Sequence, residues 1–332
     1  MKKLFEKALL AIVSVLVATS AYHATLPNPT VATEKAANAS IQGDHNYEKG
    51  LSLEEDHLYA DSEDGKPNEW DDYVELESAV KQLRDALLEG QEEIEVKIIS
   101  TLDFNEKDVL CNNLYYPAFS EEYAEDYIFA GNFLDHNAAG ACYKLRSIDD
   151  CHWDIVFSGV EYAMTPAQLA DMECRIKDIV DNLGIRDASD YKKCSEIYKY
   201  ITSNVRYDYD TFDSYLAGVT TGREPGYTAY AALVDGKAVC AGYAQLFYAM
   251  CKYVGLPVRI IDGEGYSLGE WSGHSWNAVR IDGMWYQVDS TWDEGVDQAN
   301  WEFFLTGSDI PFHRVKEEAW EDIRVSAKDF SD

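Results

Sequence analysis

The feature that most constrains the fold is the pair Asp282-Gly283. It separates two segments in which apolar and polar residues alternate, HSWNAVRI before it and MWYQVDSTW after it. An Asp-Gly pair in this setting predicts a β-hairpin with a two-residue type I′ turn, in which both central residues have positive φ. Such a turn fixes the pairing of the two strands, with Ile281 opposite Met284. The sequence therefore predicts an antiparallel hairpin of known register.

This register brings an imidazole and a carboxylate together. Counted back from the turn, His274 faces Thr291, and Trp276 faces Asp289. Residues that are directly opposed, or two apart on one strand, lie on the same face. We therefore expect His274 and Asp289 to be diagonal neighbours with Cα atoms about 7–8 Å apart. A carboxylate at that separation can accept a hydrogen bond from one ring nitrogen. A slip of one residue would place the two side chains on opposite faces.

A cysteine at the predicted start of a helix is the candidate nucleophile. In the segment DGKAVCAGYAQLFYAMCKYVGLP, glycines bracket a helix of roughly residues 240–254. Cys240 lies in the first turn, where unpaired N–H groups and the positive end of the helix dipole favour the nucleophilic thiolate. Cys251 lies on the apolar stripe in the last turn, so we expect a structural role for it. Whether Cys240 lies beside His274 does not follow from the spacing.

Several neighbouring residues have more than one interpretation. Tyr207 is either a second oxyanion donor, a pocket wall or a packed core residue, and Trp292 is a candidate wall of an acyl groove. Trp276 either lines that groove or covers the His–Asp pair. Residues 258–261 predict a short strand, and the glycine-rich residues 262–273 predict a loop that is either a mobile lid or a plain connector. His313 is expected at the surface or as a capping residue.

The amino-acid composition limits the kinds of partner that the protein can bind. The chain has 28 Lys and Arg against 60 Asp and Glu, a net charge of −32 at pH 7. Such a chain repels nucleic-acid backbones and anionic membranes, so neither is an expected partner. The seven cysteines are an odd number, which leaves at least one thiol unpaired in an exported protein. They include no CxxC pair, and Asp208, Asp210 and Asp213 lack the glycine and glutamate of a calcium loop, so no metal or cofactor is predicted.

The chain divides into four predicted regions. Its first residues combine a basic start, a short apolar run and small residues, the pattern of a secretory signal peptide, so a secreted protein with no stable membrane insertion is expected. A linker or poorly ordered arm follows, and then come a small α+β accessory domain and a catalytic domain. The accessory domain should contain a helix at 73–88, a strand at 92–100 and a hairpin formed by 141–148 and 151–160. The four regions are residues 1–24, 25–71, 72–165 and 166–332.

The motifs GKAVCAGYAQLF, GLPVRI, HSWNAV and WYQVDSTWD resemble the transglutaminase-like superfamily, which has a papain-like fold. The segment DYKKCSEIYKYITSNVRYD is similar to the one that precedes the core in exported bacterial members. The resemblance covers about residues 166–310 and implies an α+β fold, in which the cysteine-bearing helix packs on an antiparallel sheet that carries the histidine and the aspartate. It implies Cys240 as nucleophile, His274 as general base and acid, and Asp289 as the residue that orients the imidazole.

The resemblance implies a reaction at amide bonds of proteins or peptides through a thioester acyl-enzyme. The superfamily includes transglutaminases, cysteine peptidases, amidases and members without activity. Three interpretations therefore stay open: transglutaminase-like acyl transfer or hydrolysis, a cysteine peptidase or cell-wall-peptide amidase, and a silent binding or scaffold protein with the same fold. All three catalytic residue types are present, which favours an enzyme.

Overall fold

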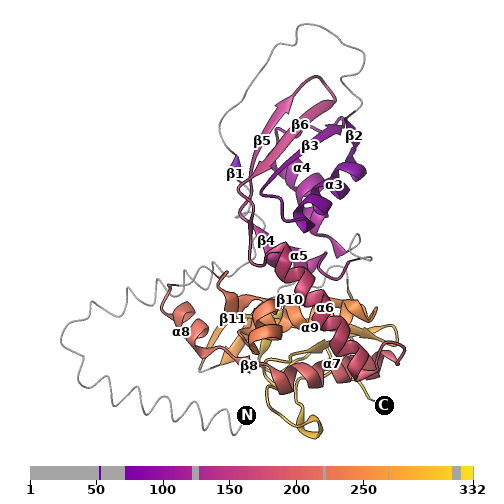
Figure 1. The fold of residues 1–332 in the computed structure, drawn as a ribbon, viewed down its shortest axis with the longest axis vertical. Coiled ribbons are helices and arrows are strands. Elements are labelled where there is room, and N and C mark those ends of the chain that lie inside the picture. Colours follow the sequence, from indigo (N-terminus) through magenta and orange to yellow (C-terminus); the bar gives the residue numbers. More distant parts are fainter. Residues whose placement is uncertain are drawn as a thin grey trace, which may run out of the picture.

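The computed structural model describes residues 52–53, 72–121, 127–219, 222–267, 269–315 and 323–331 (Figure 1). The predicted signal peptide lies outside the described residues, and so does most of the predicted linker. Within the described ranges the helices and strands build two large hydrophobic cores, one from residues 79–160 and a larger one from residues 129–305. A third, smaller cluster includes Trp276, Trp285 and Phe303. Among the helices of these ranges, none combines the length and the apolar character needed to span a bilayer.

The first core lies between a mixed sheet and a helix. The sheet has the strand order β1-β5-β6-β3-β2, and β3 (EIEVKII) buries every second residue, as a half-covered strand does. The predicted hairpin is confirmed, with β5 antiparallel to β6. The helix starts three residues later than predicted, because Val74 and Glu75 pair with β3. The elements are β1 (Ser52–Leu53), β2 (Val74–Glu75), α3 (Leu76–Leu88), β3 (Glu93–Ile99), α4 (Lys107–Leu110), β5 (Cys142–Ser147) and β6 (His152–Ser158).

A short helix connects the two cores. Helix α5 (Asn132–Asn137) places Phe133 in the second core and the adjacent Leu134 in the first. It is followed by two short strands that pair with each other, β4 (Ala138–Ala139) and β7 (Glu161–Tyr162). Figure 1 shows α5 at the junction between the indigo-to-magenta part of the chain and the red-to-yellow part.

Two long helices begin the second part of the chain. Helix α6 (Pro166–Leu183) starts with a capping box between Thr165 and Gln168 and ends at Gly184, whose φ is 63°. Helix α7 (Asp190–Asn204) is capped by the Ser189 side chain. The next elements are β8 (Arg206–Tyr207), α8 (Tyr209–Leu216), β9 (Lys237–Ala238) and α9 (Cys240–Tyr253).

The antiparallel sheet of the second part has the strand order β12-β11-β10-β13. The turn between β11 and β12 has φ of 49° at Asp282 and 82° at Gly283, and Ile281 pairs with Met284. The predicted type I′ turn is therefore confirmed, and the predicted register holds from Ile281–Met284 to Asn277–Val288. The strand pairing ends there, before the expected pairs Trp276–Asp289 and His274–Thr291. The strands are β10 (Val258–Ser267), β11 (Glu270–Ile281), β12 (Met284–Val288) and β13 (His313–Val315).

The predicted short strand and glycine-rich loop before His274 are wrong. Strand β10 runs to Ser267 and pairs along its whole length with β11. Glycine has a low strand propensity, which concealed this strand in the sequence. Its glycines are needed because aromatic rings lie against the backbone: a Cβ on Gly265 would be 3.0 Å from the Trp292 ring and 3.1 Å from the His274 ring.

Helix α9 packs on this sheet. Ten of its residues are buried, and the Asn277 side chain of β11 donates a hydrogen bond to the Ala244 carbonyl of the helix at 3.0 Å. Buried Cys251 lies on this helix within the apolar core. The helix thus has a fixed position relative to β11, and this position determines where its first residue, Cys240, meets the hairpin.

Candidate active site

Cys240 is the first residue of α9. The preceding strand β9 pairs in parallel with β8, and the Val239 N–H donates to the Gly226 carbonyl at 2.8 Å, so the backbone is held on both sides before the helix begins. Gly242 permits close packing of this turn, since a Cβ there would lie 2.6 Å from the Ala238 side chain. No side chain caps the helix start. The Gly242 and Tyr243 N–H groups donate to the Val239 carbonyl at 3.0 and 3.3 Å. Cys240, as the first helical residue, has no preceding carbonyl of the helix to donate to, so its N–H can donate to a ligand.

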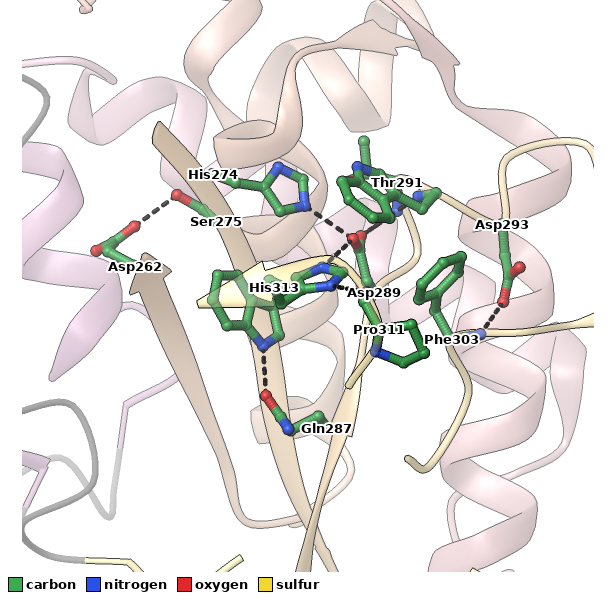
Figure 2. A network of polar contacts seen from close by, with 12 residues as sticks. Asp262, His274, Ser275, Gln287, Asp289, Thr291, Asp293, Phe303, Pro311 and His313 are labelled. Carbon is green, nitrogen blue, oxygen red and sulfur yellow. Dashed lines mark hydrogen bonds and ion pairs between the residues drawn. The ribbon is translucent and has the colours of Figure 1, made fainter. Parts of the chain in front are cut away.

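His274 contacts both Asp289 and Cys240. Its Nε2 lies 2.8 Å from Asp289 Oδ2 (Figure 2). Its side chain is also within hydrogen-bonding reach of the Cys240 thiol. Since Asp289 engages Nε2, Nδ1 is the nitrogen left for the sulfur. Burial by itself lowers the pKa of His274, but the charge and hydrogen bond of Asp289, helped by Cys240, raise it to about 10. The protonated, cationic form of the ring is therefore favoured by Asp289.

Asp289 follows the end of β12 and is completely buried. Its Oδ1 accepts hydrogen bonds from the backbone N–H groups of Thr291 at 2.9 Å and Trp292 at 3.3 Å. Burial opposes its ionisation, but His274 and His313 hold the pKa of this carboxyl well below its usual value. Asp289 is thus a carboxylate whose orientation is fixed from both oxygens.

Aromatic rings enclose the imidazole. Trp276 stacks on His274 with ring centroids 5.8 Å apart, and Trp292 lies at 5.1 Å. The Trp276 N–H donates to the Gln287 side chain at 2.9 Å. Because Trp276 is only 1% exposed, it covers the His–Asp pair and does not line an open groove, so of its two interpretations the groove wall is corrected. Trp292 is partly buried.

Two tyrosines lie near Cys240. Burial first, and then the proximity of Cys240, raise the pKa values of Tyr207 and Tyr215, so both phenols stay protonated and can donate a hydrogen bond. Tyr207 pairs with Ala238, two residues before the cysteine, and also packs against the second core. Tyr215 of α8 was not foreseen. No residue of α8 is buried. The sequence therefore held no pattern of buried positions that could indicate where the Tyr215 side chain lies.

His313 is the main residue that the sequence interpretation misplaced. Its side chain is completely buried, not at the surface, and its Nε2 lies 3.0 Å from Asp289 Oδ2. Strand β13 pairs with β10, placing His313 opposite Gly265, where the missing side chain leaves room for the rings. This pairing joins segments about fifty residues apart, which no local pattern predicts.

We assign no metal to the described residues. Two groups have ligand-type atoms within 4.8 Å of one another, namely Asp149 with Cys151 and His152, and Asp289 with His274 and His313. In the second group hydrogen bonds among the three side chains already satisfy the atoms concerned. All seven cysteines lie in the described ranges, and none forms a disulfide there.

Residues 177–290 match the family model described as the transglutaminase-like superfamily. This stretch includes α9 with Cys240, the β10–β12 sheet with His274, and Asp289. Together with the packing of α9 on the antiparallel sheet, the match identifies this part of the chain as a transglutaminase-like core with the papain-like fold. The predicted α+β fold class is confirmed.

Two curated relatives share this core. The chain is 30% identical over 129 residues to the kyphoscoliosis peptidase of Homo sapiens and 31% identical over 132 residues to that of Mus musculus. Each alignment covers 36% of this chain and 18% of the relative, so the chain spans less than a fifth of the length of these proteins.

Solved structures with a similar arrangement include a TGase and the periplasmic domain of TgpA from Pseudomonas aeruginosa. The TGase is 15% identical with a TM-score of 0.33, and the match covers 63% of this chain and 53% of the TGase chain. The TgpA domain is 17% identical with a TM-score of 0.27, and the match covers 46% of this chain and 63% of the TgpA chain. The fold assignment rests on the family match.

Proposed function

We propose that this protein is a thiol enzyme that acts on amide bonds of proteins or peptides through Cys240, His274 and Asp289. The observation that carries the proposal is the position of one imidazole between a helix-starting thiol and a buried carboxylate. A nucleophile, a base beside it and a third group that orients the base are the recurring elements of covalent acyl transfer.

The reaction would proceed in two halves. The Cys240 sulfur attacks the amide carbonyl carbon, and the oxygen becomes an oxyanion that the Cys240 backbone N–H can stabilise. His274 gives its Nδ1 proton to the leaving nitrogen, the C–N bond breaks, and a thioester remains on Cys240. Water or a primary amine then attacks the thioester, gives a proton to His274 and releases the sulfur. Asp289 keeps Nε2 protonated and the ring oriented throughout.

The substrate class follows from charge and from the shared chemistry. With a net charge of −32, the enzyme disfavours polyanionic substrates and is suited to neutral or basic protein segments. Cell-wall peptide is one candidate, in keeping with the secretion expected from residues 1–24. Transfer and hydrolysis differ only in the nucleophile that reaches the thioester.

One experiment separates these outcomes. The full chain is incubated with a glutamine-containing protein and a fluorescent primary amine, while amine incorporation, ammonia release and peptide cleavage are followed together. Incorporation indicates a cross-linking acyltransferase, ammonia release alone indicates a deamidase, and cleavage indicates a peptidase. All three activities should disappear in Cys240→Ala and persist in the matched control Cys251→Ala, whose thiol is buried in the core.

Thiol labelling tests the nucleophile without a substrate. We expect iodoacetamide at pH 6.5 to alkylate Cys240 at least about 10-fold faster than Cys174, although Cys174 is the more exposed of the two. The reason is that Cys240, unlike Cys174, has the protonated His274 ring beside it. Equal rates, together with no turnover in the amine assay, would identify a silent scaffold. Full activity in Cys240→Ala would reject the nucleophile assignment.

A further inference from the structure

His313 donates two hydrogen bonds from one ring. Its Nδ1 lies 2.8 Å from the Pro311 carbonyl oxygen, and its Nε2 lies 3.0 Å from Asp289 Oδ2 (Figure 2). A carbonyl oxygen can only accept, and an ionised carboxylate can only accept. Both ring nitrogens must therefore carry a proton, so this geometry requires an imidazolium. The ring is shielded from solvent, with the Trp292 ring centroid at 4.4 Å and that of Trp276 at 4.8 Å.

We propose that His313 is a positioning residue that, as a buried cation, holds the Asp289 carboxylate in place for His274. Asp289 Oδ2 then accepts from two imidazoles, while its Oδ1 accepts from two backbone N–H groups. Each carboxylate oxygen is therefore held by two donors. The catalytic consequence of this arrangement rests on the function proposed above, but the protonation of His313 does not.

Charge balance supports the assignment. A buried ion is costly unless it is paired. Asp289 with His313 is a neutral pair, so the buried group stays neutral overall whether His274 and Cys240 are both uncharged or form a thiolate–imidazolium pair. If His313 were uncharged, either state would leave a net charge of −1, that of Asp289, in an aromatic enclosure. The charged groups facing His313 from the packed elements are Asp289 and His274, whose ring centroid lies 5.3 Å away. Arg314 and Glu264 pair with each other at the surface.

The two histidines that share the Asp289 carboxylate have different roles. His274 uses one nitrogen for Asp289 and offers the other to Cys240, whereas both nitrogens of His313 are occupied. His313 therefore has no free nitrogen with which to exchange a proton with a substrate. Its effect must reach the reaction through Asp289 and His274, and it should change the turnover rate and the titration of His274 with little effect on substrate binding.

Nitrogen-15 NMR of the full chain with labelled histidine tests the charge directly. We expect one histidine, assigned by its loss in His313→Gln, to show two protonated ring nitrogens from pH 6 to pH 8. The measurement is made on the Cys240→Ala background as well, so it does not depend on any activity. A neutral His313 ring in this range, with one unprotonated nitrogen, would overturn the proposal even if the enzyme is active.

Kinetics of two variants test the positioning role. His313→Gln keeps a neutral donor toward Asp289 and should lower kcat roughly 10-fold, while His313→Leu keeps the packing volume without a donor and should lower it roughly 100-fold, the range typical of residues that orient an active-site group. KM should change less than about 2-fold in both. His152→Gln, which removes a surface His–Asp contact in β6, is the matched control and should leave kcat unchanged.

The dependence of kcat on pH distinguishes a positioning role of His313 from a role in packing alone. Removing a cation 5.3 Å from His274 stabilises the His274 imidazolium, so the alkaline limb of kcat should move upward by about one pH unit in His313→Gln. An unshifted limb with a normal kcat would overturn the proposal. If Cys240→Ala retained activity while His313 proved cationic, the function proposed above would fail and the charge assignment would stand.

Discussion

Two His–Asp pairs of the molecule, His274 with Asp289 and His136 with Asp262, differ in what the second ring nitrogen does. In the first pair, His274 binds Asp289 through Nε2 and leaves Nδ1 for Cys240. In the second, His136 of α5 binds Asp262 of β10 through Nε2 at 3.2 Å, and its Nδ1 donates to the Asn132 carbonyl at 2.7 Å. Because Nδ1 of His274 is left for the Cys240 sulfur, the first pair can take part in proton transfer. Two occupied nitrogens make the second a connection between α5 and the sheet.

Successive side chains of β11 point to opposite faces of the sheet, so the strand contributes a residue to each pair. His274 lies beside Asp289, while the next residue, Ser275, donates from the opposite face to Asp262. The second pair is part of a wider contact between the two cores. Buried Glu121 lies 3.3 Å from Arg259 and 3.6 Å from Lys252, and it accepts a hydrogen bond from Tyr248. Adjacent residues of β11 thus belong to the candidate active site on one face and to the contact between the two cores on the other.

The largest expected difference between the two pairs is in kcat/KM after the imidazole of His274 or of His136 is removed. His274→Gln should lower kcat/KM by about 10⁴-fold, because neither proton transfer nor the ion pair with Cys240 survives. His136→Gln should leave kcat/KM per folded molecule within about 3-fold of the parent chain. Parallel amine-incorporation kinetics on both variants check this. A comparable loss in the two variants would mean that the pairs do not differ in the way proposed.

Asp289→Asn should have the next largest effect, a fall in kcat of about 10²–10⁴-fold. An amide in place of the carboxylate faces two imidazole N–H groups and offers one oxygen to both, so His274 loses its fixed orientation. The measurement is kcat at pH 7 alongside the thermal midpoint. Asp262→Asn, the equivalent change in the second pair, is the control, and it should lower the midpoint while kcat stays near the parent value.

The His274–Asp289 pair could be predicted from sequence because a two-residue turn fixes it and only fifteen residues separate the two. The second pair and His313 could not. His136 and Asp262 are more than one hundred residues apart, and His313 reaches Asp289 only because β13 pairs with β10. The helix that begins at Cys240 could likewise be predicted from neighbouring residues in the sequence. The contact of Cys240 with His274 could not, because it depends on how α9 packs on the sheet. Turns and periodicity specify neighbours along the chain, and tertiary packing specifies the rest.

Stability should depend on pH through both pairs. Burial lowers the pKa of His136, but Asp262 outweighs it and raises the pKa to about 9, while that of His274 is about 10. A raised folded-state pKa stabilises the protein fully below about pH 6.5, and the contribution is lost as the pH rises toward the folded value. The free energy of unfolding should therefore decrease between pH 6.5 and pH 10. For His136 the loss is of the order of 3 kcal/mol.

Urea titrations from pH 6 to pH 10 measure this dependence, and His136→Gln isolates one pair. The variant should be less stable than the parent at pH 6 and nearly equal to it above pH 9, so its curve is flatter. Activity should behave differently, since kcat should fall only as His274 loses its proton near pH 10. A parent chain whose stability does not change between pH 6.5 and pH 9 would contradict the assignment of a charged His136.

The smallest expected effect is at Ser275, and it tests whether the two faces of β11 are independent. Ser275→Ala removes one hydrogen bond to Asp262, which still has His136 as its partner, so the free energy of unfolding should fall by about 1 kcal/mol. Because the Ser275 side chain points away from Asp289, kcat and the pH of the alkaline limb should not change, although its backbone adjoins that of His274. A change in kcat greater than about 3-fold would show that the attachment of α5 is coupled to the imidazole. The second pair would then have to be counted as part of the active site.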